Sequence, residues 1–387
     1  MSFAPAFIFV LTMGAVNFFG DVTYEGGGSI NGQFLGALGA SAAIISIVAG
    51  AGEFLGYSLR SVSGYVADRT GRYWLVTLVG YAINALAVPA MVLATSWQVA
   101  AVFLLLERIG RAIRKPTVEA MLSYSTGTLG KGWVYGLNTA LDEAGATLGP
   151  LLVALVLYLG GNYRAAYGVL LISALLTLGA LAVARINFPL PSRLEEGKTA
   201  PMRGFTSAYW TYMAAASCFA AGLMSFELIA YHLAQTKLVA GPWIPVMLAF
   251  STFCAVIASL VLGKLYDRVG MPVVFVAVCL SALFAPLVFQ DNLTAALLAM
   301  PLWGIGYATQ DTLFKVLIAR VLPEEKRNTA FGVFYIGYGA GWLIGSIATG
   351  LLYDHSRIAL VMFVVAAQLV SLPVFFLGLR QERYPAS

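Results

Sequence analysis

The sequence predicts an all-α membrane protein in which twelve transmembrane helices form two pseudo-symmetric six-helix bundles. Three observations support this fold class. Of the 387 residues, 60% are hydrophobic and only 11% are charged, with a mean hydropathy of +0.83, which excludes a water-soluble globular protein. The apolar residues fall in about twelve runs of roughly 20 residues, the length that spans a ~30 Å hydrocarbon core. A polar motif also recurs once in each half of the chain.

The predicted spans follow these apolar runs, because a chain in lipid must satisfy its backbone hydrogen bonds within helices. Short polar breaks separate the runs, and one longer polar segment lies at 187–204. We therefore expect an N-terminal bundle at 1–186, a linker at 187–204 and a C-terminal bundle at 205–387. The expected spans are 5–24, 34–58, 73–95, 97–120, 132–159, 163–186, 205–234, 241–263, 271–290, 292–320, 329–353 and 358–380.

The distribution of basic residues predicts the orientation in the membrane. Lys and Arg concentrate in the breaks that follow even-numbered spans, whereas the opposite side carries few of them. By the positive-inside rule, both termini and the linker face the cytoplasm. The first span has no Lys or Arg before it, and it contains Asn17 and Asp21. We therefore interpret it as a membrane helix and not as a cleaved signal peptide.

A short motif, G-x-x-x-D-R-x-G, indicates that the two halves are related. It runs from Gly64 to Gly71 and again from Gly263 to Gly270, 199 residues later. Four further glycine pairs repeat at a spacing of 196 residues, and one loop insertion explains the difference. Chance explains so many pairs in one register poorly, so we interpret the halves as a duplication, which is typical of transporters. The pairs are Gly110 and Gly306, Gly136 and Gly332, Gly145 and Gly341, and Gly149 and Gly345.

Charged motifs also lie inside the spans of the first half. They are Asp21-Val-Thr-Tyr-Glu25, Glu53, Glu107-Arg108-Ile-Gly110-Arg111-Ala-Ile-Arg114-Lys-Pro116 and Leu141-Asp142-Glu143-Ala-Gly145. With these motifs and the two Asp-Arg repeats, the chain resembles the major facilitator superfamily over nearly its whole length, and one prokaryotic branch in particular. The resemblance implies transport by alternating access, with spans one, four, seven and ten lining a central cavity.

The Asp-Arg repeats are candidates for a conformational latch that is closed in the outward-open state. Asp68 can accept hydrogen bonds from a neighbouring helix N-terminus, and the arginines can hold adjacent helix ends. The alternative is that these residues only supply the positive charge that orients the loops. Tyr73 departs from the family pattern, because it follows Arg72 where a basic residue is usual. The latch candidates are Gly64, Asp68, Arg69, Arg72, Glu119, Asp267 and Arg268.

Acidic residues inside the spans are candidates for proton coupling. Each would cost roughly 2.5–3.5 kcal/mol facing lipid at a helix centre, so they should face the bundle interior or one another. A carboxyl group removed from water can bind and release a proton reversibly. Asp142 shares a helix face with Gly145 and Gly149, which permit close packing. The candidates are Asp142, Glu53, Glu227, Asp21 and Glu25, and the alternative for each is a structural hydrogen bond.

A third group of residues is predicted to line the substrate cavity. Arg108 has no acid four residues away on its own helix, whereas Glu107 with Arg111 and Asp311 with Lys315 can neutralise each other as i,i+4 pairs. Aromatic faces with a few polar groups suit an amphipathic organic substrate, although core packing is the commoner role of an aromatic residue. The cavity candidates are Asn17, Tyr24, Arg108, Arg111, Tyr231, Trp303, Tyr307, Gln310 and Asp311.

These observations predict a secondary active transporter, first of all a proton-coupled exporter (an antiporter) of a small organic or amphipathic compound. The run Gly145-x-x-x-Gly149-Pro150 resembles a motif of exporting members of the family, and the alternative is ordinary close helix packing followed by a proline kink. Proton-coupled import of an organic anion is the alternative, because Arg108 and Arg111 can bind a carboxylate or phosphate. A membrane receptor or enzyme is more remote, since no nucleophile-base constellation or phosphate-binding glycine loop is present.

The expected partners are a small-molecule substrate, protons and the lipid bilayer. We expect no nucleic acid, metal or cofactor, and a monomeric protein in the cytoplasmic (inner) membrane of a prokaryote. The three cysteines all fall inside apolar runs, and this indicates small core residues without metal-ligand spacing.

Overall fold

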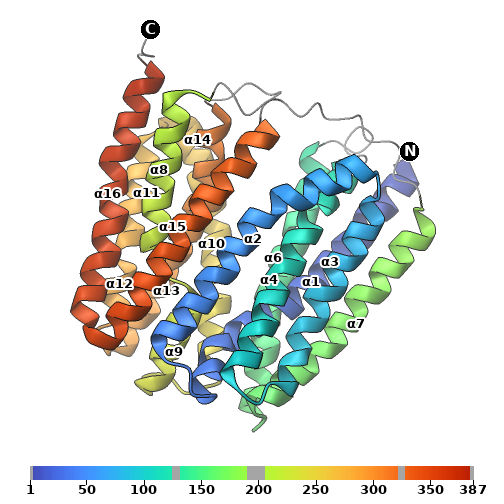
Figure 1. Cartoon of the computed structure of the whole chain (residues 1–387), viewed down its shortest axis with the longest axis horizontal. Coiled ribbons are helices and arrows are strands. Elements are labelled where there is room, and N and C mark those ends of the chain that lie inside the picture. Colours follow the sequence, from blue (N-terminus) through green and yellow to red (C-terminus); the bar gives the residue numbers. More distant parts are fainter. Residues whose placement is uncertain (1–2, 124–130, 190–204, 321–326, 384–387) are drawn as a thin grey trace. The chain divides into compact units, whose positions relative to one another are not determined.

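The computed structural model describes residues 3–123, 131–189, 205–320 and 327–383, and every regular element in these ranges is a helix (Figure 1). The all-α fold class is therefore confirmed. Contacts between Cα atoms divide the chain into two compact units. Unit 1 comprises residues 1–39, 58–197 and 241–249, and unit 2 comprises residues 40–57, 198–240 and 250–387. The predicted division at 187–204 stays a prediction, and most of that segment lies outside the described residues.

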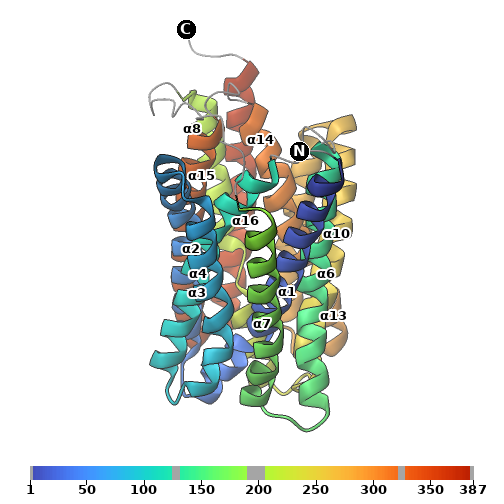
Figure 2. The same cartoon turned by 90° about the vertical axis from the view of Figure 1, so that its right-hand side faces the viewer.

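In the described part of unit 1, long helices run side by side. Helix α1 contacts α6 and α7, and α3 contacts α4 and α7 (Figure 2). A 3₁₀ turn at Met91–Leu93 continues α3, and α2 contributes its first part to unit 2 and its second part to unit 1. The helices are α1 (Phe3–Ala37), α2 (Ala42–Thr70), α3 (Tyr73–Ala90), α4 (Trp97–Ser123), α6 (Lys131–Tyr158) and α7 (Tyr163–Asn187).

Unit 2 contains shorter helices and more interruptions. Helix α8 contacts α15 and α16, and α11 contacts α13 and α16. A π-helical turn, η2, connects α13 to α14. The first part of α10, up to residue 249, belongs to unit 1 and the rest to unit 2. The elements are α8 (Ser207–Gly222), α9 (Phe226–Gln235), α10 (Trp243–Val269), α11 (Pro272–Ala282), α12 (Phe284–Val288), α13 (Leu293–Ala308), η2 (Thr309–Phe314), α14 (Lys315–Arg320), α15 (Arg327–His355) and α16 (Arg357–Arg383).

Eight helical segments of the described residues are long and apolar enough to cross a membrane, which makes the chain a multi-pass membrane protein. Helix α4 is less apolar, because it carries the charged residues of the candidate site. The predicted total of twelve spans stays a prediction. The eight segments are Ala6–Ala37, Ala42–Thr70, Tyr73–Leu93, Gly136–Tyr158, Tyr163–Asn187, Ser207–Gln235, Trp243–Val269 and Arg357–Glu382.

The first predicted boundary is wrong, because α1 continues through the expected break at 25–33 to Ala37. Gly26 falls in the expected break, yet it lies inside the helix and against a neighbour. A Cβ atom added to Gly26 would lie 2.9 Å from Leu170 Cδ2 and 3.2 Å from the Gly149 carbonyl oxygen. This glycine therefore serves close helix packing. As a consequence Asp21 and Glu25 lie in the middle of α1, and not near its outer end.

The span expected at 205–234 is interrupted, because α8 ends at Gly222 and α9 begins at Phe226. Side chains from other helices supply hydrogen-bond donors to the backbone at this break. Gln368 Nε2 donates to the Gly222 carbonyl oxygen at 2.8 Å, and Trp303 Nε1 donates to that of Met224 at 2.8 Å. Helix breaks at membrane depth are tolerated where protein groups satisfy the freed backbone in this way.

The duplication inferred from the glycine pairs has a structural counterpart in each unit. Gly145 and Gly149 on α6 lie so close to two α1 carbonyl oxygens, one turn apart, that a Cβ atom would overlap them. Gly341 and Gly345 on α15 meet two carbonyl oxygens of α8 in the same way. The last glycine of each G-x-x-x-D-R-x-G motif has a positive φ, 65° at Gly71 and 78° at Gly270, and follows the last residue of α2 or α10. Only glycine adopts this conformation without cost.

Candidate functional site

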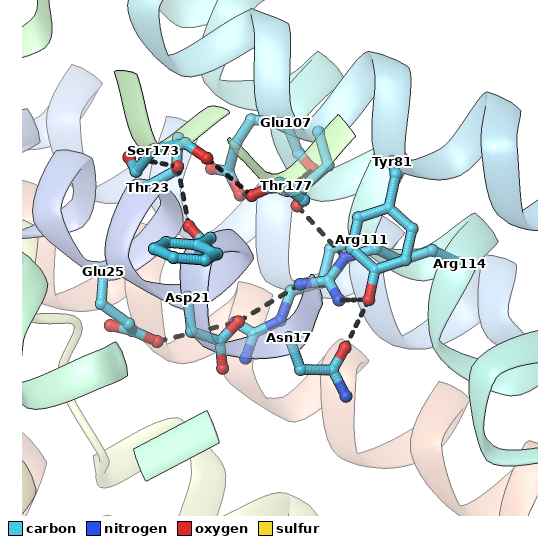
Figure 3. A network of polar contacts seen from close by, with 12 residues as sticks. Asn17, Asp21, Thr23, Glu25, Tyr81, Glu107, Arg111, Arg114, Ser173 and Thr177 are labelled. Atoms are coloured by element: carbon cyan, nitrogen blue, oxygen red, sulfur yellow. Dashed lines mark hydrogen bonds and ion pairs between the residues drawn. The ribbon is translucent and has the colours of Figure 1, made fainter. Parts of the chain in front are cut away.

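A buried network of polar side chains connects α1, α3 and α4 in unit 1, with Arg114 at its centre (Figure 3). The Arg114 residue is only 4% exposed. Its Nε donates to Asn84 Oδ1 at 3.1 Å, its Nη1 to Tyr81 Oη at 3.0 Å, and its Nη2 to Asp21 Oδ1 at 3.2 Å. Because each guanidinium nitrogen has a partner on α1 or α3, the position and plane of the group are fixed.

The network extends from Arg114 in two directions. The Tyr81 hydroxyl donates to Asn17 Oδ1, and Asn17 Nδ2 donates to Asn138 Oδ1 at 2.6 Å. On the other side, Asn84 Nδ2 donates to the carbonyl oxygen of Glu107 at 3.0 Å and to its Oε1 at 3.3 Å. Buried polar groups in a membrane protein are costly unless they are hydrogen-bonded, and this network satisfies most of its own members.

The close approach of α3 and α4 makes this network possible. A Cβ atom added to Gly80 would lie 2.7 Å from the backbone nitrogen of Arg114, and one added to Gly110 would lie 2.8 Å from the Gly80 carbonyl oxygen. The small residues let the two backbones touch, so the side chains of Arg114 and Asn84 can reach each other.

A cavity of about 30 Å³, room for about one water molecule, lies beside Arg114. The predicted coupling residues Asp21 and Asp142 both line it, which brings together two acids from α1 and α6. Its remaining lining residues are Asn17, Arg114, Lys115, Val118, Glu119 and Asn138. A site with three carboxyl groups, two cations and space for water can hold and exchange a proton.

The predicted cavity residues Tyr24, Arg108 and Arg111 also lie together. The Arg111 guanidinium carbon is 3.8 Å from the centroid of the Tyr24 ring, and that of Arg108 is 4.9 Å from the same centroid. Arg111 Nη1 is 3.8 Å from Glu25 Oε1, and Arg108 Nε is 3.7 Å from Glu107 Oε2. Two cations therefore face one aromatic ring of α1.

In unit 2, Trp303 and Tyr307 lie with their ring centroids 4.3 Å apart, and Trp303 donates to the α8–α9 break. Gln310 lies in the π-helical turn, where its Nε2 donates to Tyr57 Oη and its Oε1 accepts from Tyr338 Oη, both at 2.6 Å. The packed rings agree with a role in the core, and the buried polar groups beside them agree with a role in a substrate cavity. These contacts do not distinguish the two interpretations of the aromatic residues.

The remaining candidate acids belong to unit 2, which includes the first part of α2. Glu227 is 5% exposed in the first turn of α9, where a helix N-terminus favours a negative charge. Glu53 is half-buried in α2, and Tyr231 is half-buried in α9. Asp311 Oδ1 is 3.4 Å from Lys315 Nζ, and both side chains are about half exposed, as expected for a self-neutralising i,i+4 pair.

Most latch candidates lie on helices and not in loops, since Gly64, Asp68 and Arg69 belong to α2 and the second copy to α10. Asp68 Oδ1 accepts a hydrogen bond from the Tyr73 hydroxyl at 2.7 Å, so a side chain at the start of α3 is its partner. Tyr73, at which the sequence departs from the family pattern, is therefore the residue that donates a hydrogen bond to Asp68. Arg69 Nη1 donates to Tyr65 Oη at 3.1 Å, and Arg72, Asp267 and Arg268 are exposed. Glu119 lines the cavity beside Asp142.

The sequence reasoning missed the central residue, Arg114, and its partners Tyr81 and Asn84. A signal was present, because Arg108, Arg111 and Arg114 follow one another at three-residue spacing inside a predicted span. The i,i+4 pairs within one helix do not reveal Arg114, because its hydrogen-bond partners lie on α1 and α3. The 196-residue repeat also aligns Arg114 with Gln310 and Asp142 with Tyr338, and in unit 2 the Tyr338 hydroxyl donates to Gln310 Oε1.

Comparisons with known proteins agree with this architecture. A family model described as the Major Facilitator Superfamily matches residues 6–318 and, in a second match, residues 244–387. An uncharacterized protein of Mycobacterium tuberculosis is 32% identical over 379 residues, which cover 96% of this chain and 93% of that protein. An uncharacterized MFS-type transporter of Methanocaldococcus jannaschii is 27% identical over 366 residues, 90% of this chain and 89% of that protein.

Solved structures show the same fold. A mutant of the peptide transporter POT superposes with a TM-score of 0.79 at 13% identity, and the match covers 97% of this chain and 95% of the other. At that identity the likeness concerns the fold alone, while the family match and the relatives cover nearly the whole chain. The chain belongs to the major facilitator superfamily and is a multi-pass membrane transporter and not an enzyme.

Proposed function

We propose that the protein is a proton-coupled secondary transporter of a small organic compound, with Asp142 as the coupling acid. The observation that carries the proposal is the shared cavity, which Asp142 and Asp21 line together with Glu119 and the cations Arg114 and Lys115. Acids that share a cation compete for it, so a proton on Asp142 changes how strongly Arg114 stabilises Asp21.

The coupling cycle follows from this competition. With a proton on Asp142, Arg114 pairs with Asp21 alone, as its 3.2 Å contact allows. When Asp142 loses the proton, its charge attracts the same guanidinium and pulls α6 toward α4. Because α6 contacts α1 through Gly145 and Gly149, a small shift of α6 is transmitted to α1. Protonation thereby biases one conformation of the alternating-access cycle over the other.

Export by antiport is the direction we propose first, on the resemblance of the Gly145–Pro150 run to exporting members of the family. The aromatic residues Trp303 and Tyr307 of α13 suit an amphipathic substrate. Glu53 ranks second to Asp142 as a coupling acid and Glu227 third. We place the protein in the cytoplasmic membrane of a prokaryote, with both termini in the cytoplasm.

Proton-coupled import of an organic anion is a second candidate, which the two cations at Tyr24 favour. One experiment separates the two. A thermal-shift screen first identifies a stabilising compound, and the purified transporter is then reconstituted in vesicles with an imposed pH difference. Antiport predicts that the compound accumulates on the acidic side, and symport that it accumulates on the alkaline side. Accumulation that a proton ionophore leaves unchanged would contradict proton coupling in both forms.

A further inference from the structure

The three arginines of α4 differ in their surroundings, and the difference separates their roles. Arg114 makes three hydrogen bonds to α1 and α3. Arg111 and Arg108 approach carboxylates at 3.8 and 3.7 Å, and both face the ring of Tyr24. Arg114 is therefore a fixed part of the protein, whereas the other two cations converge on one aromatic side chain of α1.

Tyr24 carries an unsatisfied polar group in the described part of the structure. The residue is 5% exposed, yet its hydroxyl has no hydrogen-bond partner there. Buried tyrosine hydroxyls usually find a partner, because an unmade hydrogen bond is costly. Two guanidinium groups over the ring and an unsatisfied hydroxyl on the same side chain are donors that match the oxygen atoms of a carboxylate, sulfonate or phosphate.

We propose that Arg108, Arg111 and Tyr24 bind the anionic group of an organic substrate whose apolar body extends away from them. This assignment rests on the proposed transport function and names its substrate class. The guanidinium groups supply charge and planar pairs of donors, and the Tyr24 hydroxyl supplies a further donor. Glu25, whose side chain is 24% exposed like that of Arg111, is the carboxylate with which the bound anion competes.

The test measures binding to the full-length protein, purified in a detergent with a neutral head group, by its thermal unfolding. The probes are naphthoate, naphthalenesulfonate and naphthyl phosphate, with neutral naphthamide as the matched compound. We expect at least one anion to raise the unfolding temperature more than naphthamide. Arg111→Gln should weaken its binding about 10- to 100-fold, and Tyr24→Phe about three- to tenfold. Arg108→Lys should weaken it although the charge is kept.

Arg185→Gln is the matched control, because it removes one cation from unit 1 at an arginine that contacts Trp74 and the Pro189 carbonyl oxygen. It should leave anion binding unchanged. The assignment is wrong if no anion stabilises the protein beyond naphthamide, or if Arg111→Gln and Arg185→Gln affect binding equally. It is also overturned if only added phosphatidylglycerol binds through these residues, since a lipid head group would then be the ligand.

This experiment distinguishes a failure of the anion-binding proposal from a failure of the proton-coupling proposal. Thermal unfolding needs no pH difference, so a wild-type protein that binds the anion but moves it without protons would contradict the coupling proposal alone. Asp142→Asn should retain anion binding, and loss of binding only in the Arg111 and Tyr24 variants supports the substrate assignment independently of coupling.

Discussion

The ion pair between Arg114 and Asp21 offers a quantitative test of the buried network. Arg114→Gln removes the guanidinium and leaves Asp21, 7% exposed, without the cation that lies 3.2 Å away. Removing one partner of a buried ion pair costs about 3–5 kcal/mol, because a buried charge remains uncompensated. The three hydrogen bonds of Arg114 place the expected loss at the upper end of that range.

A double-mutant cycle distinguishes the interaction energy of the ion pair from a general loss of stability. Asp21→Asn, Arg114→Gln and the combination are unfolded in mixed detergent micelles, with the free energy of unfolding followed by tryptophan fluorescence. Because the double variant contains neither charge of the pair, it should be more stable than the sum of the single losses predicts, by about 1–3 kcal/mol. If the two single losses simply add, Arg114 and Asp21 are not coupled and the network does not work as a unit.

Three further predictions concern the latch, the α1–α6 contact and the orientation. Asp68→Asn should strongly lower transport while membrane insertion and ligand affinity stay nearly intact, and a wild-type transport rate in that variant would refute the latch. Gly149→Ala should destabilise the protein by about 1–3 kcal/mol, because the new Cβ would lie 2.5 Å from the Val22 carbonyl oxygen. Gly179→Ala is the control and should not destabilise the protein, because its new Cβ would have nothing within 4 Å. Cysteines at Glu195 and Pro385, in a variant without native cysteines, should react only with reagents on the cytoplasmic side, and labelling of the two from opposite sides would contradict the topology.

The fold class was predictable because lipid imposes simple rules on a sequence. Long apolar runs can only be helices, and the repeated glycines report helix contacts that exist in both units. Boundaries were harder, since glycine serves both loops and close packing. Gly26 falls between the expected spans 5–24 and 34–58 but lies inside α1 against Leu170. The interruption after Gly222 was harder to predict, because Gly222 and Ser225 are only weak helix-end signals and the backbone partners, Gln368 and Trp303, lie far along the chain.

The site was predictable in part for the same reason. Charges inside apolar runs pointed to Asp21, Asp142 and Arg111, since burial of a charge in a membrane is costly and needs a function or a partner. Which charges meet depends on helix packing, which a single sequence does not contain. Arg114 was therefore overlooked although it lies in the same motif, and its partners Tyr81 and Asn84 carry no charge that would mark them.

The central claim is that Asp142 couples transport to protons, and the Asp142→Asn variant tests it most directly. The compound found by thermal shift is loaded into vesicles that contain wild type, Asp142→Asn or the control Asp354→Asn, an exposed acid at the end of α15. We predict that Asp142→Asn still exchanges labelled for unlabelled compound but no longer accumulates it when a pH difference is imposed, whereas the control does both. Accumulation against the gradient by Asp142→Asn would show that this acid is structural and would contradict the account.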